Sequence, residues 1–344
     1  MRFGSFVFPI SHIPENDSVV IDNTLQEVEL ADELGFDAVW LTEHHFDGAS
    51  AYVDPVVFAA AIAVRTKRVK IGFAVVEMAF HHPVRLAAQT ALLDNLSHGR
   101  LIVGTGRGSA FNHYEYIGFG LTMEEGAERL PEAEDLLVKA WTGEDFKYEG
   151  KFWKVAFPRL RPRPYQKPHP PLVRACISET STIAMAKIGR PILMLVQPLD
   201  DIRKRLELYR ETMLGAGFDE AATEAALDQT WVAKNLMVAD SYDKAREIAD
   251  VGFRRERKHF REARELYNPD GFPAPEPGAP IAPGEDLDQS FIMGTPQQVA
   301  ERIAELRDVG VRNLMLKLNI GEMAKEDVHT SMRLFGEKVL PLFK

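Results

Sequence analysis

A carboxylate and two adjacent histidines stand where an apolar segment of the sequence ends. Residues 38–41, Ala-Val-Trp-Leu, have the character of a buried strand, and Glu43, His44 and His45 follow it. A histidine titrates near neutral pH and can act as a general acid or base. Because side chains alternate along an extended chain, only one of the two imidazoles can face a site at the strand end. The residue types leave two interpretations open, an acid–base centre and polar strand-end residues bonded to backbone.

A metal site is a third interpretation of the same stretch. Adjacent histidines chelate a metal poorly from an extended chain, and the sequence contains neither His-x-His nor His-Glu-x-x-His. We therefore predict no metal ion in this protein.

Two other segments carry residues suited to binding an anion. The segment "VGTGRGSAF" places Arg107 between glycines, and "CISETSTIAMA" places Ser178 and Ser181 where a helix begins. A guanidinium can bind a phosphate through two hydrogen bonds, and a helix start offers N–H groups and a positive dipole end. An ordinary glycine-rich turn and simple helix capping would explain the same residues. In isolation, Arg129 has the character of a surface helix residue.

A repeated unit predicts how these segments are arranged. An amphipathic segment ends at a glycine, and an apolar strand begins two or three residues later, at Gly35, Gly99, Gly189 and Gly310. Glycine after a helix end adopts the left-handed conformation without steric cost. The strands that follow are apolar on consecutive residues, as in a parallel sheet covered on both faces. The candidate strands are residues 2–8, 37–42, 70–76, 101–105, 173–178, 191–196, 229–238 and 313–319.

Strands alternating with helices in this way predict an α/β fold of the (β/α)8 TIM-barrel type, in which chemistry sits at the carboxyl ends of the strands. The rival is a doubly wound open sheet, whose glycine-rich turn should follow the first strand, but "PISHIPENDS" there contains no glycine. We predict one domain over residues 1–344, with a long insertion after the seventh strand. This insertion or lid region spans 253–292, because the stretch 268–290 is longer than ordinary connections.

Composition limits the class of partner. The net charge of -10 argues against a nucleic-acid-binding protein, which would need a basic patch. Cys176 is the single cysteine, so an intrachain disulfide is impossible. The start "MRFGSFVFPI" is too short for a signal peptide, and no apolar run approaches the roughly 20 residues of a membrane helix. We therefore expect a cytoplasmic protein that binds neither nucleic acid nor membrane.

Several motifs, taken in order along essentially the whole chain, resemble those of the bacterial luciferase-like flavin-dependent monooxygenases. The Glu-His-His after the second strand and the Gly-Arg-Gly after the fourth are the most specific parts of the resemblance. The motifs that carry it are "GFDAVWLTEHHF", "IGFAVVEMAFHHPVRLAAQ", "LSHGRLIVGTGRG", "PRPYQKPHPPLV" and "FIMGTPQQVAERI".

The resemblance implies a (β/α)8 barrel that binds reduced FMN (FMNH2) delivered by a separate flavin reductase. With O2, such an enzyme oxidises a small organic substrate through a flavin hydroperoxide. The segment "SAFNHYEY" offers Phe111, His113, Tyr114 and Tyr116 as pocket-lining residues, so we expect a mostly apolar or aromatic substrate. A homodimer is implied as well, and the apolar helices after the second and third strands suit such an interface. The alternatives are an F420-dependent oxidoreductase of the same barrel family, a non-catalytic flavin-binding barrel and a metal-dependent barrel hydrolase.

The resemblance also assigns roles to individual residues. His44 matches the catalytic histidine, and Glu43 matches a carboxylate near the flavin ring. The step from Ala74 to Val75 matches a non-proline cis peptide under the flavin. The positions matched to phosphate-binding arginines and to strand-end hydroxyls are Arg107, Arg129, Ser178 and Ser181.

Two positions depart from luciferase. Ile177 replaces an acidic residue before the serine, and Gly106 stands where luciferase has a reactive cysteine. The second departure excludes a thiol role at that position.

Overall fold

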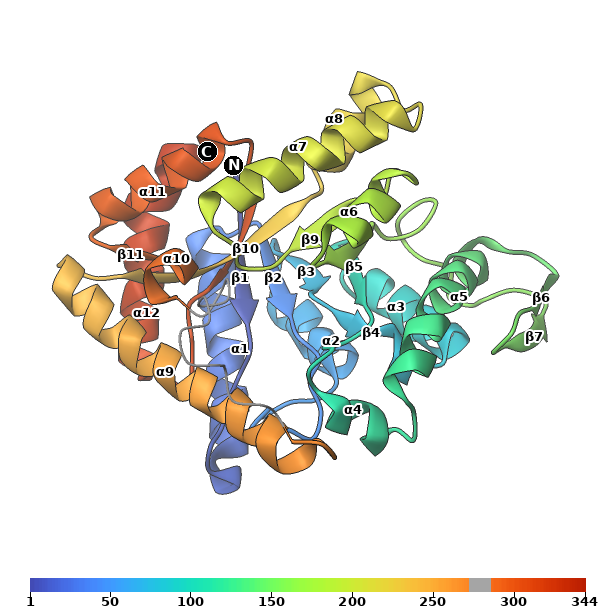
Figure 1. Cartoon of the computed structure of the whole chain (residues 1–344), viewed down its shortest axis with the longest axis horizontal. Helices are drawn as coiled ribbons and strands as arrows, with labels where there is room; N and C mark the ends of the chain where they lie inside the picture. The colour runs from blue at the N-terminus through green and yellow to red at the C-terminus, as the bar shows by residue number, and fades with distance from the viewer. Residues whose placement is uncertain (272–285) are drawn as a thin grey trace.

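The computed structural model describes residues 1–271 and 286–344, and its centre is a closed barrel of parallel strands (Figure 1). Each barrel strand pairs with the next one along the chain, and the last pairs with both its predecessor and the first. The barrel strands are β1 (Arg2–Val7), β2 (Ala38–Leu41), β3 (Lys70–Phe73), β5 (Leu101–Gly106), β8 (Leu172–Cys176), β9 (Ile192–Met194), β10 (Trp231–Val238) and β12 (Asn313–Lys317). They overlap the eight predicted segments, so the predicted (β/α)8 barrel is confirmed.

Helices surround this barrel and connect its strands. They are α1 (Asp17–Leu34), α2 (Pro55–Arg65), α3 (Pro83–Leu96), α4 (His113–Gly118), α5 (Met123–Thr142), α6 (Glu179–Ala186), α7 (Leu199–Gly215), α8 (Glu220–Leu227), α9 (Tyr242–Tyr267), α10 (Leu287–Ser290), α11 (Pro296–Asp308) and α12 (Lys325–Leu334). Short 3-10 or π turns lie at Pro14–Asn16 (η1), Met78–Phe80 (η2), Phe335–Val339 (η3) and Leu340–Phe343 (η4). Among the helices of the described residues, none has the length and apolar character that crossing a membrane requires.

Some short elements were not predicted from the sequence. Strand β4 (Val76–Glu77) continues beyond β3 and pairs with β5. Strand β11 (Phe291–Gly294) pairs with the last residues of β10, outside the closed ring. Strands β6 (Phe146–Glu149) and β7 (Lys154–Phe157) form a separate antiparallel hairpin. These strands are two to four residues long, too short for a periodic apolar pattern to reveal them.

The predicted insertion after the seventh strand has a helical first part. Its residues 253–267 complete α9, a helix of 26 residues rich in arginine, glutamate and alanine. These residue types have high helix propensity. Residues 272–285 of the predicted loop 268–290 lie outside the described part of the chain. In Figure 1, α9 runs across one end of the barrel beside α4.

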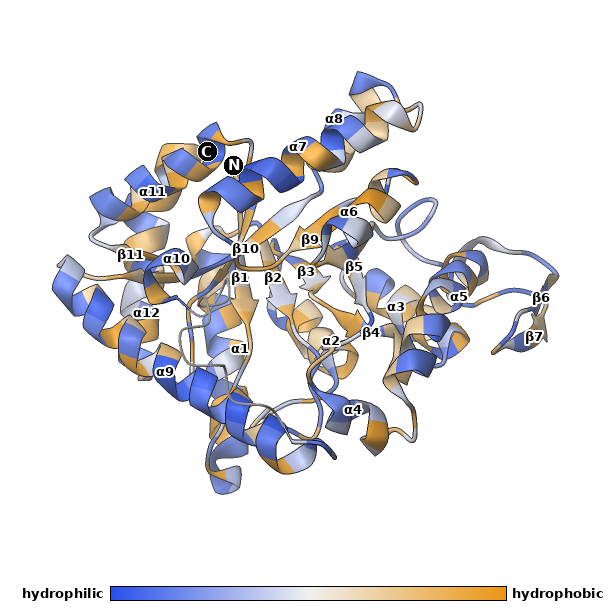
Figure 2. Ribbon diagram, viewed as in Figure 1, coloured by the Kyte–Doolittle hydropathy of each residue, from blue (hydrophilic) through white to orange (hydrophobic). Residues whose placement is uncertain are grey.

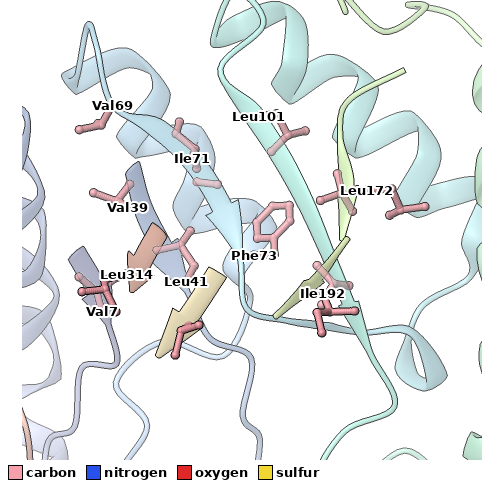
Figure 3. Close-up of a cluster of buried hydrophobic side chains, with 14 of the residues drawn as sticks. Val7, Val39, Leu41, Val69, Ile71, Phe73, Leu101, Leu172, Ile192 and Leu314 are labelled. Atoms are coloured by element: carbon pink, nitrogen blue, oxygen red, sulfur yellow. The ribbon is translucent and has the colours of Figure 1, made fainter. Parts of the chain in front are cut away.

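Two apolar layers hold the barrel together. On β2, Val39 and Leu41 point outward into the core between strands and helices, whereas Ala38 and Trp40 belong to the barrel interior. This is the alternation expected of a strand with two buried faces. Figure 3 shows the outward-facing cluster on neighbouring strands, and Figure 2 shows the largely apolar barrel strands beneath helices of mixed polarity.

Trp40 fills the centre of the barrel because glycines face it. Its side chain is fully buried and packs edge-on against Trp231, with ring centroids 5.1 Å apart. A Cβ atom added at Gly72 would lie 2.4 Å from the Trp40 ring, and one at Gly4 would lie 2.6 Å from it. These glycines therefore serve interior packing.

This packing predicts that Gly72→Ala lowers the free energy of unfolding by about 1–3 kcal/mol, the usual cost of overpacking a core. Gly215→Ala is the matched control, because a Cβ there meets nothing within 4 Å. Urea unfolding of both variants measures the difference. Equal midpoints for the two variants would show that the barrel interior relaxes around the added methyl group.

Candidate active site

A group of glutamates and histidines gathers at the carboxyl ends of β2 and β4, the end of a (β/α)8 barrel where chemistry is expected. Three of these residues follow β2, one ends β4, one comes just after η2, and one lies on α4. We call these side chains the Glu–His cluster: Glu43, His44, His45, Glu77, His81 and Glu115.

His44 is held by a buried carboxylate. Its Nδ1 lies 3.0 Å from Oε1 of Glu115, which also accepts the backbone N–H of His45 at 3.1 Å. The Glu115 side chain is fully buried. Because a carboxylate can only accept, Nδ1 of His44 carries the hydrogen of this bond. Nε2 is then the nitrogen that can gain or lose a proton, as an acid–base catalyst requires.

Glu43 binds two other histidines rather than His44. Its Oε1 lies 2.9 Å from Nε2 of His45 and 2.8 Å from Nε2 of His81, and its Oε2 accepts the backbone N–H of Glu77 at 2.8 Å. Glu43 therefore does not bond to His44, and its place near the flavin ring stays a prediction from the family resemblance. Positions 43 and 45 lie on the same side of an extended chain, and position 44 lies on the other.

The pKa values within the cluster move in opposite directions. Burial by itself would raise the pKa of Glu43, but the charge of His81 and hydrogen bonds from His45 and His81 outweigh it, and this pKa is lowered. Burial would lower the pKa of His44, but the carboxylate of Glu115 raises it overall. Glu43 raises the pKa of His81 in the same way. Burial, Glu115 and Glu43 together hold the pKa of Glu77 well above its ordinary value.

The two adjacent histidines lie in different surroundings, as strand alternation predicts. His44 packs against Phe8 and Phe260, with ring centroids 5.0 and 6.1 Å apart, and 22% of its side chain is exposed. His45 packs against Phe119 at 4.8 Å and is 10% exposed. His44 is thus the more accessible of the two. Phe260 belongs to α9, so this helix covers the side of the barrel on which His44 lies.

The inner wall near this strand end is apolar. Half-buried side chains pack there against the interior cluster: Phe6, Ala74, Val75, Ala175 and Val196. The peptide bond between Ala74 and Val75 is cis, as the family resemblance implied. A Cβ added at Gly106 would lie 2.5 Å from Val75, and one at Gly104 would lie 1.8 Å from the carbonyl oxygen of Phe73. These glycines are explained by protein packing, not by a ligand.

The residues matched to a phosphate site lie on adjacent strand ends. Arg107 directly follows β5, which pairs with β8, and Ser178 caps the helix that follows β8. Ser178 and Ser181 form a capping box, with the Ser178 hydroxyl 3.2 Å from the Ser181 backbone nitrogen. Arg129, on α5, bonds Glu125 at 2.6 Å and lies over the ring of Phe152. Arg107 and the Ser178–Ser181 turn therefore follow two neighbouring barrel strands. Arg129, by contrast, already has partners within the protein.

A separate cavity opens at the opposite end of the barrel. Its volume is about 410 Å³, and its lining includes Arg2, Asp37 and Lys70, at or next to the amino ends of β1, β2 and β3. Catalytic residues of such barrels come from the other end, so this cavity is not the active site.

Sequence reasoning missed Glu115, Glu77 and His81. Glu115 lies in "SAFNHYEY", where we would expect aromatic residues to line a substrate pocket, yet Tyr114 and Tyr116 are buried. The sequence signal for Glu115 is that it stands alone among aromatic residues. A carboxylate in apolar surroundings needs a partner, so it could have been predicted to bond another polar group.

Comparison with known proteins agrees with this geometry. The model of the luciferase-like monooxygenase family matches residues 1–313. The chain is 26% identical over 357 residues to the oxygenase component of the flavin-dependent trigonelline monooxygenase of Acinetobacter baylyi, covering 100% of this chain and 96% of that protein. It is 30% identical over 329 residues to the F420-dependent glucose-6-phosphate dehydrogenase of Microbacterium testaceum, covering 91% and 90%.

A solved structure extends the likeness to three dimensions. The crystal structure of a monooxygenase from Streptomyces bottropensis aligns over 100% of both chains, with a TM-score of 0.86 and 30% identity. The family match and the closed barrel lead to the same assignment. The chain belongs to the luciferase-like monooxygenase family and is an enzyme of this flavin-dependent kind.

Proposed function

We propose that this protein is the oxygenase of a two-component monooxygenase, which takes reduced FMN from a separate flavin reductase and uses O2 to oxidise a small, apolar organic substrate. The observation that carries the proposal is the His44–Glu115 pair, because it places a histidine with a raised pKa at the carboxyl ends of the barrel strands. The full-length similarity to the oxygenase component of a flavin-dependent monooxygenase supports it.

The residues at the barrel mouth fit this cofactor chemically. FMN combines a flat apolar ring with an anionic phosphate, and the mouth combines an apolar wall with the cationic Arg107 at its rim. In the proposed complex, Ala74 and Val75 would contact the ring. Arg107 and the Ser178–Ser181 turn would hold the phosphate, and Arg129 would join them if it left Glu125. When bound, reduced FMN supplies the electrons that activate O2.

The protein's own groups then have two tasks. His44 holds or releases a proton at Nε2, while Glu115 fixes the ring through Nδ1. The second half of α9 helps to exclude water, because Phe260 packs edge-on against the ring of His44 and stacks on Phe8. This role of α9 corresponds to the lid predicted for the region 253–292.

An assay with purified reductase tests the proposal. The protein is supplied with reduced FMN, O2 and a panel of apolar and aromatic compounds, and oxygenated products are sought by mass spectrometry. Incorporation of one oxygen atom from labelled O2 is expected for at least one compound. Hydride transfer to or from F420, with no oxygen incorporation, would contradict the proposal.

An F420-dependent oxidoreductase is the second candidate, favoured by the 30% identity to an F420-dependent dehydrogenase. The two cofactors have different absorbance spectra, so titration of the protein with each one separates the candidates. Tighter binding of FMN is the expected result.

We predict that Arg107→Ala weakens FMN binding by about 1.5–3 kcal/mol, the usual contribution of a hydrogen bond to a charged group. Fluorescence titration with FMN measures this loss, and riboflavin, which lacks the phosphate, provides the control ligand. Riboflavin affinity should be unchanged. An unchanged FMN affinity would show that Arg107 does not bind the phosphate.

The predicted homodimer uses the helices after β2 and β3. The adjacent helices α2 and α3 expose large apolar side chains, with Val57 65%, Val64 72% and Leu92 50% exposed. Exposed apolar patches of this kind are typical of interaction surfaces. Sedimentation at micromolar concentration should give the mass of two chains.

The cytoplasmic location stays a prediction from the sequence.

A further inference from the structure

Two buried carboxylate oxygens in the Glu–His cluster have no hydrogen-bond partner. They are Oε2 of Glu77 and Oε2 of Glu115. The two residues are 2% and 0% exposed, and a carboxylate oxygen of each lies within 4.8 Å of the other and of a His44 ring nitrogen. Two ionised carboxylates could not satisfy these oxygens, because both would be acceptors only. Each unpaired buried oxygen would also carry a desolvation cost.

We propose that Glu77 and Glu115 share one proton, so that Glu77 is a neutral acid that donates toward Glu115 and holds it in place against His44. A single hydrogen would then serve both unpartnered oxygens. Glu77 becomes a positioning residue that acts through Glu115, and its role in the reaction rests on the proposed function. The shared proton itself does not depend on any cofactor.

The charges around the cluster support this assignment. His81 faces Glu43 and His44 faces Glu115, so two of the three carboxylates have a cationic partner when these histidines are protonated. Within the described part of the chain, Glu77 forms no ion pair. Carboxyl groups that share a buried site do not all ionise, so Glu77, the third of them, keeps its proton. The raised pKa of Glu77 agrees with this protonated form.

Neither of the two tyrosine hydroxyls that interact with Glu77 forms a hydrogen bond with its carboxyl group. Its Oε2 lies 2.9 Å from the position of a Cβ atom at Gly108, and the Tyr116 hydroxyl is 3.0 Å from that same position. That hydroxyl donates instead to the carbonyl oxygen of Arg107 at 2.8 Å. The Tyr114 hydroxyl is buried and forms no hydrogen bond, and burial, Glu115 and Glu77 all raise its pKa. The other ionisable groups that interact with Glu77 or His44 are Glu43 and Asp47 after β2, Glu115, Tyr114 and Tyr116 on α4, and Lys317 on β12.

Infrared spectroscopy of the cofactor-free protein tests the shared proton. A protonated carboxyl group has a C=O stretching band that shifts in D2O. Burial raises the pKa of Glu27, on α1, to about 7, so Glu27 contributes to this band at lower pH. The spectrum is therefore recorded at about pH 8, where Glu27 is mostly ionised. The wild-type protein should show the band and Glu77→Gln should lack it, whereas the control variant Glu27→Gln should keep it.

Glu115→Gln provides a second test that does not depend on the stability of Glu77→Gln. Without the neighbouring charge, Glu77 ionises more readily, so its band should disappear at a lower pH than in the wild-type protein. In the same variant, NMR titration of labelled histidine should show the His44 pKa lowered by about one unit or more, a tenfold change in proton affinity, because it loses a nearby opposite charge.

Three outcomes would overturn the inference. One is a band at about pH 8 that survives in Glu77→Gln, and another is an unchanged His44 titration in Glu115→Gln. The third is one equivalent of a divalent metal in the purified protein that is lost in Glu77→Gln, because a cation would then satisfy the same oxygens. None of these measurements uses flavin, so their results are independent of the proposed monooxygenase activity. With the reductase present, a lower yield of oxygenated product in Glu115→Gln, with Glu27→Gln unchanged, supports the positioning of His44 by Glu115, the residue through which Glu77 acts.

Discussion

His44→Ala should bind FMN like the wild-type protein but form about 10²–10⁴-fold less oxygenated product, the usual contribution of a general acid or base. The reason is geometric. His44 is the partly exposed histidine of the pair, and its Nδ1–H is held by Glu115, so Nε2 is the nitrogen that exchanges protons. Without it, O2 consumption should continue and end in hydrogen peroxide. The measurement is product formed, and peroxide released, per reduced flavin oxidised.

His45→Ala is the matched control for this prediction. His45 is buried, bonds Glu43 and packs against Phe119, so its loss should lower stability more than coupling. If His44→Ala kept normal coupling while His45→Ala lost it, the roles assigned to the two histidines would be reversed. If both variants stayed coupled, the Glu–His cluster would be structural and the mechanistic proposal would fail.

Glu43→Ala should lower the free energy of unfolding by about 3–5 kcal/mol, the typical cost of removing one partner of a buried ion pair. Glu43 is 1% exposed and accepts from His45, His81 and the backbone N–H of Glu77. Removing it leaves these donors without their acceptor in a buried site. Urea unfolding measures the effect.

The loss should depend on pH with a sign that the pKa shifts determine. The pKa of Glu43 is lowered from 4.5, so its contribution to stability is present above pH 4.5 and is lost as pH falls through the folded-state value. The pKa of His81 is raised from 6.5, so its contribution is present below pH 6.5 and is lost as pH rises through the folded-state value. The difference between Glu43→Ala and wild type should therefore be largest between pH 4.5 and 6.5.

A surface ion pair provides the control for Glu43. Glu128 bonds Lys151 at 2.6 Å, but the two side chains are 57% and 66% exposed. Exposed pairs contribute about 0–1 kcal/mol, so Glu128→Ala should change stability little at any pH. A Glu43→Ala variant no less stable than Glu128→Ala would show that the pairing of Glu43 with His45 and His81 contributes nothing.

The sequence by itself determined the barrel and the position of its functional end. The glycines at 35, 99, 189 and 310 all have the left-handed backbone conformation that the repeated unit required. Apolar strands on consecutive residues predicted two buried faces, and β2 shows both. These are local properties, because a backbone angle or a burial pattern is set by residues close together in the chain.

Alternation along an extended chain separated His44 from His45, and the family resemblance selected His44. The same alternation places Glu43 on the side of His45. The structure agrees with this separation and shows that Glu43 bonds to His45, whereas His44 bonds to Glu115.

Only the tertiary structure decided which carboxylates act on which histidines. Glu115 lies 71 positions from His44 in the chain, and His81 lies 38 positions from Glu43. The helix α9 supplies Phe260 to His44 from more than two hundred residues away. Barrel closure brings these segments together, and no short-range pattern encodes such contacts. The protonation of the cluster follows from them, because a pKa inside a protein depends on burial and on neighbouring charges that only the folded chain provides.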